Sequence, residues 1–309
     1  MADPLVTVII MAARREHLLS NTLNSVKAQS YPNVQIIVTG SNEQSIRRIT
    51  DDMQGIEVLA DPSATDTRLL NRALEKATGT FLAVLETGNL WFPDFLAVQL
   101  EMLVTGKADL TIANGLEETI GQDPVVLFQA RQNYRKVMAQ AFDTWYHPTQ
   151  EELLPMLTGD QLPPVSAFVF RKTLLDKGWA DQFIRYYHQA AMISLLNKYK
   201  PVIATCRKRL WFRRLDPLTH LQPIENAIRE GEQCVLEATS LLTYTALRKD
   251  QRSYLKDSIS LQYRLLALSC RKAALQTDSI RYTLKAIRYR PALLKILVKK
   301  SKTYLLRRI

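Results

Sequence analysis

A single carboxylate, Glu86, follows a short apolar run, Phe81–Leu85, in the amino-terminal half of the chain. If that run is a parallel strand, Glu86 lies at its carboxyl end, where open α/β sheets bind ligands. A carboxylate in such a place offers the hard, anionic oxygen that magnesium and manganese prefer. Glu86 either contacts a ligand there or caps the turn that follows, and the sequence leaves both interpretations open.

The second residue type with chemical potential is histidine. His188 could accept a proton, because the ordinary pKa of an imidazole is about 6.5, or it could be a surface or packing residue. His17 and His147 have no partners at ligand spacing, and the chain has no Gly-Lys-Ser/Thr phosphate loop. The serine, histidine and aspartate residues are too dispersed to assign a catalytic triad. The three cysteines are too far apart for a zinc site or a disulfide framework, which favours a reducing, cytoplasmic compartment.

Alternating strand and helix patterns must position these groups. Apolar runs predict strands at residues 6–10, 34–38, 56–59, 81–85, 110–113 and 165–170, and one or two strands at 202–212. Stripes at helical spacing predict helices between them, with Ser41 or Asn42 capping the second helix. Such β-α repeats predict an α/β fold with a mostly parallel, Rossmann-type sheet flanked by helices on both faces. No run reaches the roughly 20 apolar residues that a membrane-spanning helix needs.

The character changes after Pro217, so we predict an α/β domain over 1–216 and a helical region over 217–309. The 309-residue chain has a formal net charge of +11, and from residue 271 onward twelve basic residues face one acidic residue. The pattern of apolar and basic residues over 291–309 predicts a basic amphipathic helix. This helix either lies on an anionic membrane surface or docks on the body of the protein. No nucleic-acid motif accompanies the charge, which disfavours nucleic acid as a partner.

Several landmarks in order resemble the family-two glycosyltransferases, which have the nucleotide-sugar-binding GT-A fold. Residues 4–215 carry this resemblance. The landmarks are the first strand Val6–Ile10, the segment Leu23–Asn33 (LNSVKAQSYPN), the helix residues Asn71–Leu74 before Thr78-Gly79, the strand Phe81–Leu85 before Leu90-Trp91 and Pro93, and the stretch Val165–Lys172. The resemblance implies transfer of a sugar from a nucleotide sugar to a hydroxyl group, with Mn²⁺ or Mg²⁺ neutralising the diphosphate.

The positions that match the family's functional motifs have changed. The metal-binding Asp-x-Asp pair is Glu86-Thr87-Gly88 here, with Asn89 offering a neutral oxygen. The acidic turn after the second strand is replaced by one containing Ser41, and the basic residue before the helix asparagine is replaced by leucine, with Arg68 two positions away. The resemblance therefore leaves Glu86 as a residual metal ligand, and Ser41, Arg68 and Asn89 as residual donor contacts.

The family's general base is an acidic residue, and His188 stands in the corresponding stretch. Carboxylates from elsewhere, such as Asp61, Asp66 or Asp94, could replace the missing ones. We predict a family-two homologue whose metal-dependent chemistry is weakened or lost, acting as a binding or scaffold partner of a second glycosyltransferase in glycan assembly. The alternatives are an active, unusual transferase for a cell-envelope glycan or lipid-linked acceptor, and an adaptor at the inner face of the membrane.

Overall fold

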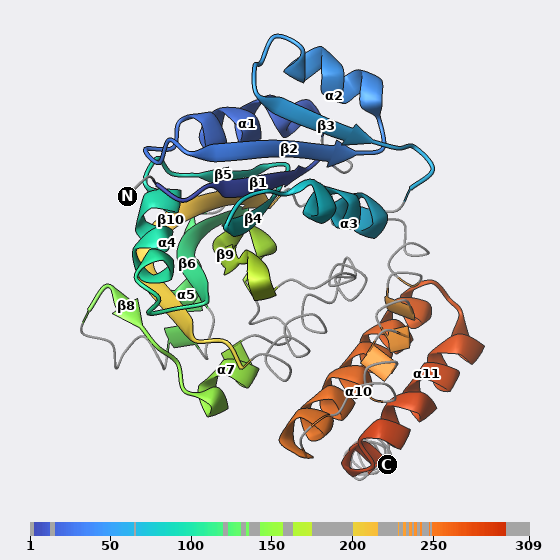
Figure 1. The fold of residues 1–309 in the computed structure, drawn as a ribbon. Coiled ribbons are helices and arrows are strands. Elements are labelled where there is room, and N and C mark those ends of the chain that lie inside the picture. Colours follow the sequence, from blue (N-terminus) through green and yellow to red (C-terminus); the bar gives the residue numbers. More distant parts are fainter. Residues whose placement is uncertain are drawn as a thin grey trace, which may run out of the picture. The chain divides into compact units, whose positions relative to one another are not determined.

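The computed structural model describes residues 3–12, 16–64, 66–119, 123–130, 134–135, 143–156, 163–174, 200–215, 228, 231–232, 235–236, 238–239, 242, 247 and 249–294. The chain divides into two compact units, Met1–Pro217 and Leu218–Ile309. The first contains the sheet and the second contains helices (Figure 1).

In the described part of the first unit, ten strands form one sheet. Its main order is β3-β2-β1-β4-β9-β6-β10-β5, with β7 beside β6 and β8 beside β10. The strands are β1 (Val6–Met11), β2 (Val34–Gly40), β3 (Ile56–Ala60), β4 (Phe81–Glu86), β5 (Asn89–Trp91), β6 (Leu110–Thr119), β7 (Val125–Val126), β8 (Trp145–Tyr146), β9 (Phe168–Arg171) and β10 (Ile203–Leu215). The half from β3 to β4 is parallel, and β9 then runs antiparallel between β4 and β6.

Helices lie on both faces of this sheet, as the β-α pattern predicts. They are α1 (Leu19–Lys27), α2 (Glu43–Thr50), α3 (Asp66–Lys76), α4 (Phe95–Val104), α5 (Leu127–Ala130) and α7 (Gln150–Met156). The chain moves outward from β1 to β3 and then returns to β4 on the other side of β1. Because such crossovers are right-handed, α3 lies on the face opposite α1 and α2 (Figure 1). The strand order therefore reverses between β1 and β4.

Local chemistry accounts for these elements. The inner strands are buried on both sides, and Val8, Ile9 and Ile10 of β1 are fully inaccessible to solvent. Asn42 is the residue that caps α2, because its side chain accepts a hydrogen bond from the backbone N–H of Ser45 at 3.0 Å. These patterns act over a few residues, so the sequence predicted the strand and a cap at Ser41 or Asn42, and the structure assigns the cap to Asn42.

Two strands differ from the prediction. Residues 165–167 form a 3₁₀ turn and β9 begins only at Phe168, because Pro164 precedes the turn and Ser166 turns its hydroxyl toward β4. Residues 202–212, predicted to form one or two strands, belong to one long strand, β10, whose register with β6 shifts between Cys206 and Arg209 and again before Trp211. These shifts mark a bulge, which redirects the side chains of the longer strand.

The carboxyl-terminal unit contains a helical hairpin of α10 (Lys249–Lys272) and α11 (Gln276–Tyr289). The hydroxyl of Ser260 donates to the carbonyl of Ala286 at 2.8 Å, and that of Ser279 donates to Ala267 at 2.8 Å, so the helices run antiparallel. No helix in the described part of the chain is long and apolar enough to cross a membrane. Most of the predicted basic helix over 291–309 lies outside the described residues.

Candidate functional site at the carboxyl edge of the sheet

Strands β1, β2 and β4 end together at the point where the strand order reverses. Met11 of β1 pairs with Thr39 of β2 on one side and with Glu86 of β4 on the other. The backbone N–H of Ala12 donates to the carbonyl of Thr39 at 2.6 Å, so the ends of β1 and β2 stay joined beyond the sheet. This is the place at which open α/β sheets bind ligands. Glu86 lies there, as predicted.

The turn after Glu86 is held tightly to the neighbouring elements. The hydroxyl of Thr87 donates to the carbonyl of Met11 at 2.9 Å, and the N–H of Gly88 donates to the hydroxyl of Thr22 in α1 at 3.0 Å. Gly88 has φ +97°, a conformation that glycine adopts readily and that strains other residues. The position that would carry the second carboxylate of an Asp-x-Asp pair is therefore one where the backbone itself favours glycine.

Ser166 connects this turn to the segment before β9. Its side-chain oxygen accepts hydrogen bonds from the N–H of Glu86 at 3.0 Å and from the side-chain amide of Asn89 at 2.7 Å. Its carbonyl accepts a bond from the indole N–H of Trp91 at 2.8 Å. Ser166 is fully buried, and its contacts come from residues about 80 positions earlier in the chain. Sequence reasoning missed it, and its only signal was a polar residue within an apolar run.

Asn89 also contacts the Glu86 carboxylate. It is 6% exposed, and its side-chain amide lies 3.4 Å from a carboxylate oxygen of Glu86, at the long limit of a hydrogen bond. An amide donor next to a carboxylate stabilises the negative charge without a cation. Glu86, Asn89 and Ser166 thus form one small network, in which Glu86 is half-buried.

The other candidate carboxylates do not complete a metal site in the described structure. Asp61 follows β3, and it accepts bonds from the hydroxyl and N–H of Ser63 at 2.7 and 2.9 Å. These bonds, together with the charges of Arg72 and Arg68, hold the pKa of Asp61 below its usual value. Asp94 is exposed and precedes α4, and the side chain of Asp66 lies outside the described residues.

Within the ranges that the structure describes, no three His, Cys, Asp or Glu residues are grouped so that they could hold a metal ion. Near the turn, Glu86 supplies one carboxylate, whereas the Thr87 hydroxyl and the Asn89 amide donate hydrogen bonds to protein atoms. Divalent cations of this class prefer several anionic oxygen ligands. The donor set at this turn therefore does not fit the carboxylate pair that Mn²⁺ or Mg²⁺ would need.

The remaining predicted residues are placed as follows. Ser41 is exposed and lies two residues beyond Thr39, so it shares the sheet edge with Glu86 and Asn89. Arg68 is exposed on α3, and its charge acts on Asp61. His188 lies outside the described residues. The structure thus brings three of the five predicted residues to one edge.

Comparison with known proteins then decides the family. The sequence profile of Glycosyl transferase family 2 matches residues 7–177, which is more than half of the chain. The chain belongs to the family-two glycosyltransferases. The resemblance predicted from the sequence is confirmed, and the matched range includes the turn at Glu86 but ends before His188.

Two curated proteins with glycosyltransferase names are among the similar sequences. The Escherichia coli protein WfgD, named as a UDP-Glc:α-D-GlcNAc-diphosphoundecaprenol β-1,3-glucosyltransferase, is 27% identical over 130 residues, covering 41% of this chain and 51% of WfgD. The Bacillus subtilis protein TuaG, a putative teichuronic acid biosynthesis glycosyltransferase by name, is 30% identical over 107 residues, covering 33% of this chain and 42% of TuaG. The chain spans about half the length of the curated relatives it matches.

Solved structures show the same fold. S. aureus TarS 1–349, in complex with UDP-GlcNAc, has a TM-score of 0.62 at 14% identity, with 92% of this chain and 81% of that chain covered. The mannosyltransferase PcManGT from Pyrobaculum calidifontis, in complex with GDP-Man and Mn²⁺, has a TM-score of 0.53 at 15% identity, with 94% of this chain and 82% of that chain covered. At these identities the likeness establishes the GT-A fold, with a central sheet flanked by helices.

Proposed function

We propose that this family-two glycosyltransferase homologue binds a nucleotide sugar and takes part in the assembly of a cell-envelope glycan, while its metal-dependent transfer chemistry is weakened or lost. Its role is then that of a binding or scaffold partner to a second, active glycosyltransferase. The family assignment and the names of WfgD and TuaG support the glycan pathway. The construction of the turn at Glu86 supports the loss of metal-dependent chemistry.

The observation that carries this proposal is the Glu86–Asn89–Ser166 network. A metal-dependent transferase of this family needs a cation between carboxylates and the diphosphate of the donor. Here one carboxylate remains, the second position is a glycine with positive φ, and the amide of Asn89 is directed to Ser166 at 2.7 Å. The residues that could have served the cation are instead bonded to one another.

For the donor itself, we propose that Ser41 and Asn89 contact the nucleotide sugar at the shared edge of β2 and β4. Arg68 supplies positive charge from α3 toward the phosphates. If transfer persists, His188 is the base that removes the proton from the acceptor hydroxyl. An active transferase is thus the principal alternative, and the test below separates it from a binding partner.

The test compares thermal unfolding of the full chain with UDP-Glc, UDP-GlcNAc and GDP-Man, each with Mn²⁺ and with EDTA. A ligand at a hundred times its dissociation constant stabilises a protein by about 2.7 kcal/mol, which is readily measured. We expect at least one nucleotide sugar to raise the melting temperature equally in Mn²⁺ and in EDTA. The variant Glu86→Gln should keep that increase. If no donor raises it, nucleotide-sugar binding is ruled out.

A second variant tests the metal argument in the opposite direction. Asn89→Asp puts a carboxylate where the amide now lies 3.4 Å from Glu86, so the two carboxylates could share a cation. We expect this variant to gain a stabilisation by Mn²⁺ that the wild type lacks. Mn²⁺-dependent donor binding or sugar transfer by the wild type, abolished in Glu86→Gln, would show that the metal-dependent chemistry has been kept.

The basic carboxyl terminus supports the further proposal of an attachment to the inner face of the membrane. Removing residues 291–309 takes away six cations and should abolish binding to vesicles of anionic phospholipid, but leave the effect of nucleotide sugars unchanged. Equal binding by the full and shortened chains would reject this attachment.

A further inference from the structure

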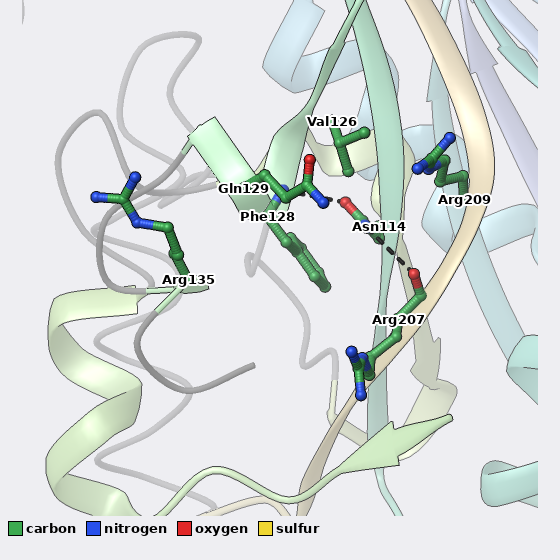
Figure 2. A pocket seen from close by; sticks show the side chains of 7 residues that line it. All are labelled: Asn114, Val126, Phe128, Gln129, Arg135, Arg207 and Arg209. Carbon is green, nitrogen blue, oxygen red and sulfur yellow. Dashed lines mark hydrogen bonds between the residues drawn. The ribbon is translucent and has the colours of Figure 1, made fainter. Parts of the chain in front are cut away.

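We infer that a cationic pocket between β6, α5 and β10 binds a phosphate or diphosphate group of the glycan acceptor. This assignment to an acceptor rests on the proposed role in glycan assembly. The pocket has a volume of about 380 Å³ and is shown in Figure 2. Its lining consists of Asn114, Val126, Phe128, Gln129, Arg135, Arg207 and Arg209. Three guanidinium groups and no carboxylate belong to this lining, which suits an anion.

The arginines of β10 pair with different kinds of residue on the neighbouring strand β6. Arg213 and Arg214 stand opposite Glu117 and Glu118 of β6, and each forms an ion pair with its partner. Arg209 stands opposite Asn114, which is neutral. Among the described residues no carboxylate forms an ion pair with Arg209 or Arg135. Along β10, the charges of Arg213 and Arg214 are therefore matched by carboxylates, whereas Arg209, beside the pocket, has no such ion pair among the described residues.

Asn114 gives the pocket a defined shape. It is 6% exposed, and its side-chain amide donates to the carbonyl of Arg207 at 3.1 Å. Its side-chain oxygen accepts bonds from the N–H groups of Phe128 and Gly115, both at 3.0 Å. One buried side chain thus ties the bulge of β10 to the start of α5, with Arg207 and Arg209 on either side of it in Figure 2. Asn114 is thus both a lining residue of the pocket and the link between its walls.

The pocket lies close to the candidate donor site along the sheet. Ala83 of β4 and Thr111 of β6 both pair with Val169 of β9, so they lie at the same level along the strand direction. Glu86 and Asn114 each lie three residues further on, and two strand spacings, roughly 10 Å, separate them. An acceptor held by its phosphate beside Asn114 could therefore present a hydroxyl toward the donor at Glu86. Phe128 adds an apolar wall of the kind that small-molecule pockets use.

The experiment measures binding by isothermal titration calorimetry with two matched ligands. One is α-GlcNAc diphosphate carrying a short alkyl chain, and the other is the neutral methyl α-GlcNAc. We expect the wild type to bind the diphosphate and to bind the neutral sugar at least tenfold more weakly. Arg209→Gln should weaken diphosphate binding about tenfold, the loss expected for one charge-assisted hydrogen bond. Arg214→Gln, on the same strand but paired with Glu118, is the control and should bind like the wild type.

The proposal would be overturned if Arg209→Gln and Arg214→Gln bound the diphosphate ligand equally, or if the wild type bound the charged and neutral ligands equally. It would also be overturned if UDP displaced the diphosphate ligand, because the pocket would then belong to the donor. Both arginines are exposed, so neither variant should lose its fold, and circular dichroism checks this. The effect of nucleotide sugars on the melting temperature of Arg209→Gln is measured in parallel. If nucleotide sugars raise the melting temperature of neither the wild type nor the variants, donor binding is rejected, but the calorimetric result on the pocket still stands.

Discussion

Replacing Ser166 with alanine should destabilise the amino-terminal unit far more than the loss of one hydroxyl from the surface. In the native structure the Ser166 oxygen accepts bonds from the N–H of Glu86 at 3.0 Å and from the amide of Asn89 at 2.7 Å. Alanine leaves both donors without their acceptor in a buried place. Each orphaned donor destabilises by about 1–2 kcal/mol, so the free energy of unfolding should fall by about 2–4 kcal/mol.

Guanidinium unfolding followed by tryptophan fluorescence measures this directly. All four tryptophans precede residue 217, so the signal reports the unit that contains Ser166. The control is Ser63→Ala, which removes an exposed hydroxyl that donates to Asp61 at 2.7 Å and should change stability by no more than about 0.5 kcal/mol. The double variant Asn89→Ala/Ser166→Ala should lose less than the sum of the two single variants, because it removes donor and acceptor together. If Ser166→Ala and Ser63→Ala unfolded at the same guanidinium concentration, the claim that Ser166 holds the turn at Glu86 in place would be refuted.

Two further predictions concern the strands beside the pocket. Gly115→Ala should destabilise the same unit by about 1–3 kcal/mol, because a Cβ there would lie 2.2 Å from the ring of the buried Trp211; an unchanged midpoint in the same unfolding assay would contradict this. Burial raises the pKa of the Cys206 thiol from 9.0 to about 11. As the pH rises, the thiol ionises in the unfolded chain before it ionises in the folded protein, which favours unfolding. The free energy of unfolding is therefore unaffected by this thiol below pH 9 and falls by about 2–3 kcal/mol between pH 9 and 11. Cys206→Ala should flatten that part of the pH profile, and a profile as steep as that of the wild type would show that the thiol is not the cause.

Much of the fold could be predicted from the sequence because its signals are local. Strand β1, the cap of α2 and the β-α alternation each depend on residues a few positions apart, and the family landmarks lie in short segments. The same reasoning placed Glu86 at the end of a strand, which the register with Met11 confirms. The irregular start of β9 was not predictable in this way, because Ser166 turns toward a strand that the chain left 80 residues earlier.

The sequence by itself determined the family and the order of the elements, since these depend on residue types and on spacing along the chain. The tertiary structure alone decided which polar atoms meet. Asn89 reaches Ser166 across 77 residues, and Asn114 reaches Arg207 across 93. Contacts of this kind depend on strand order, register and a bulge, and no local pattern encodes them. For that reason the network at Glu86 and the cationic pocket became visible only when the strands were placed side by side.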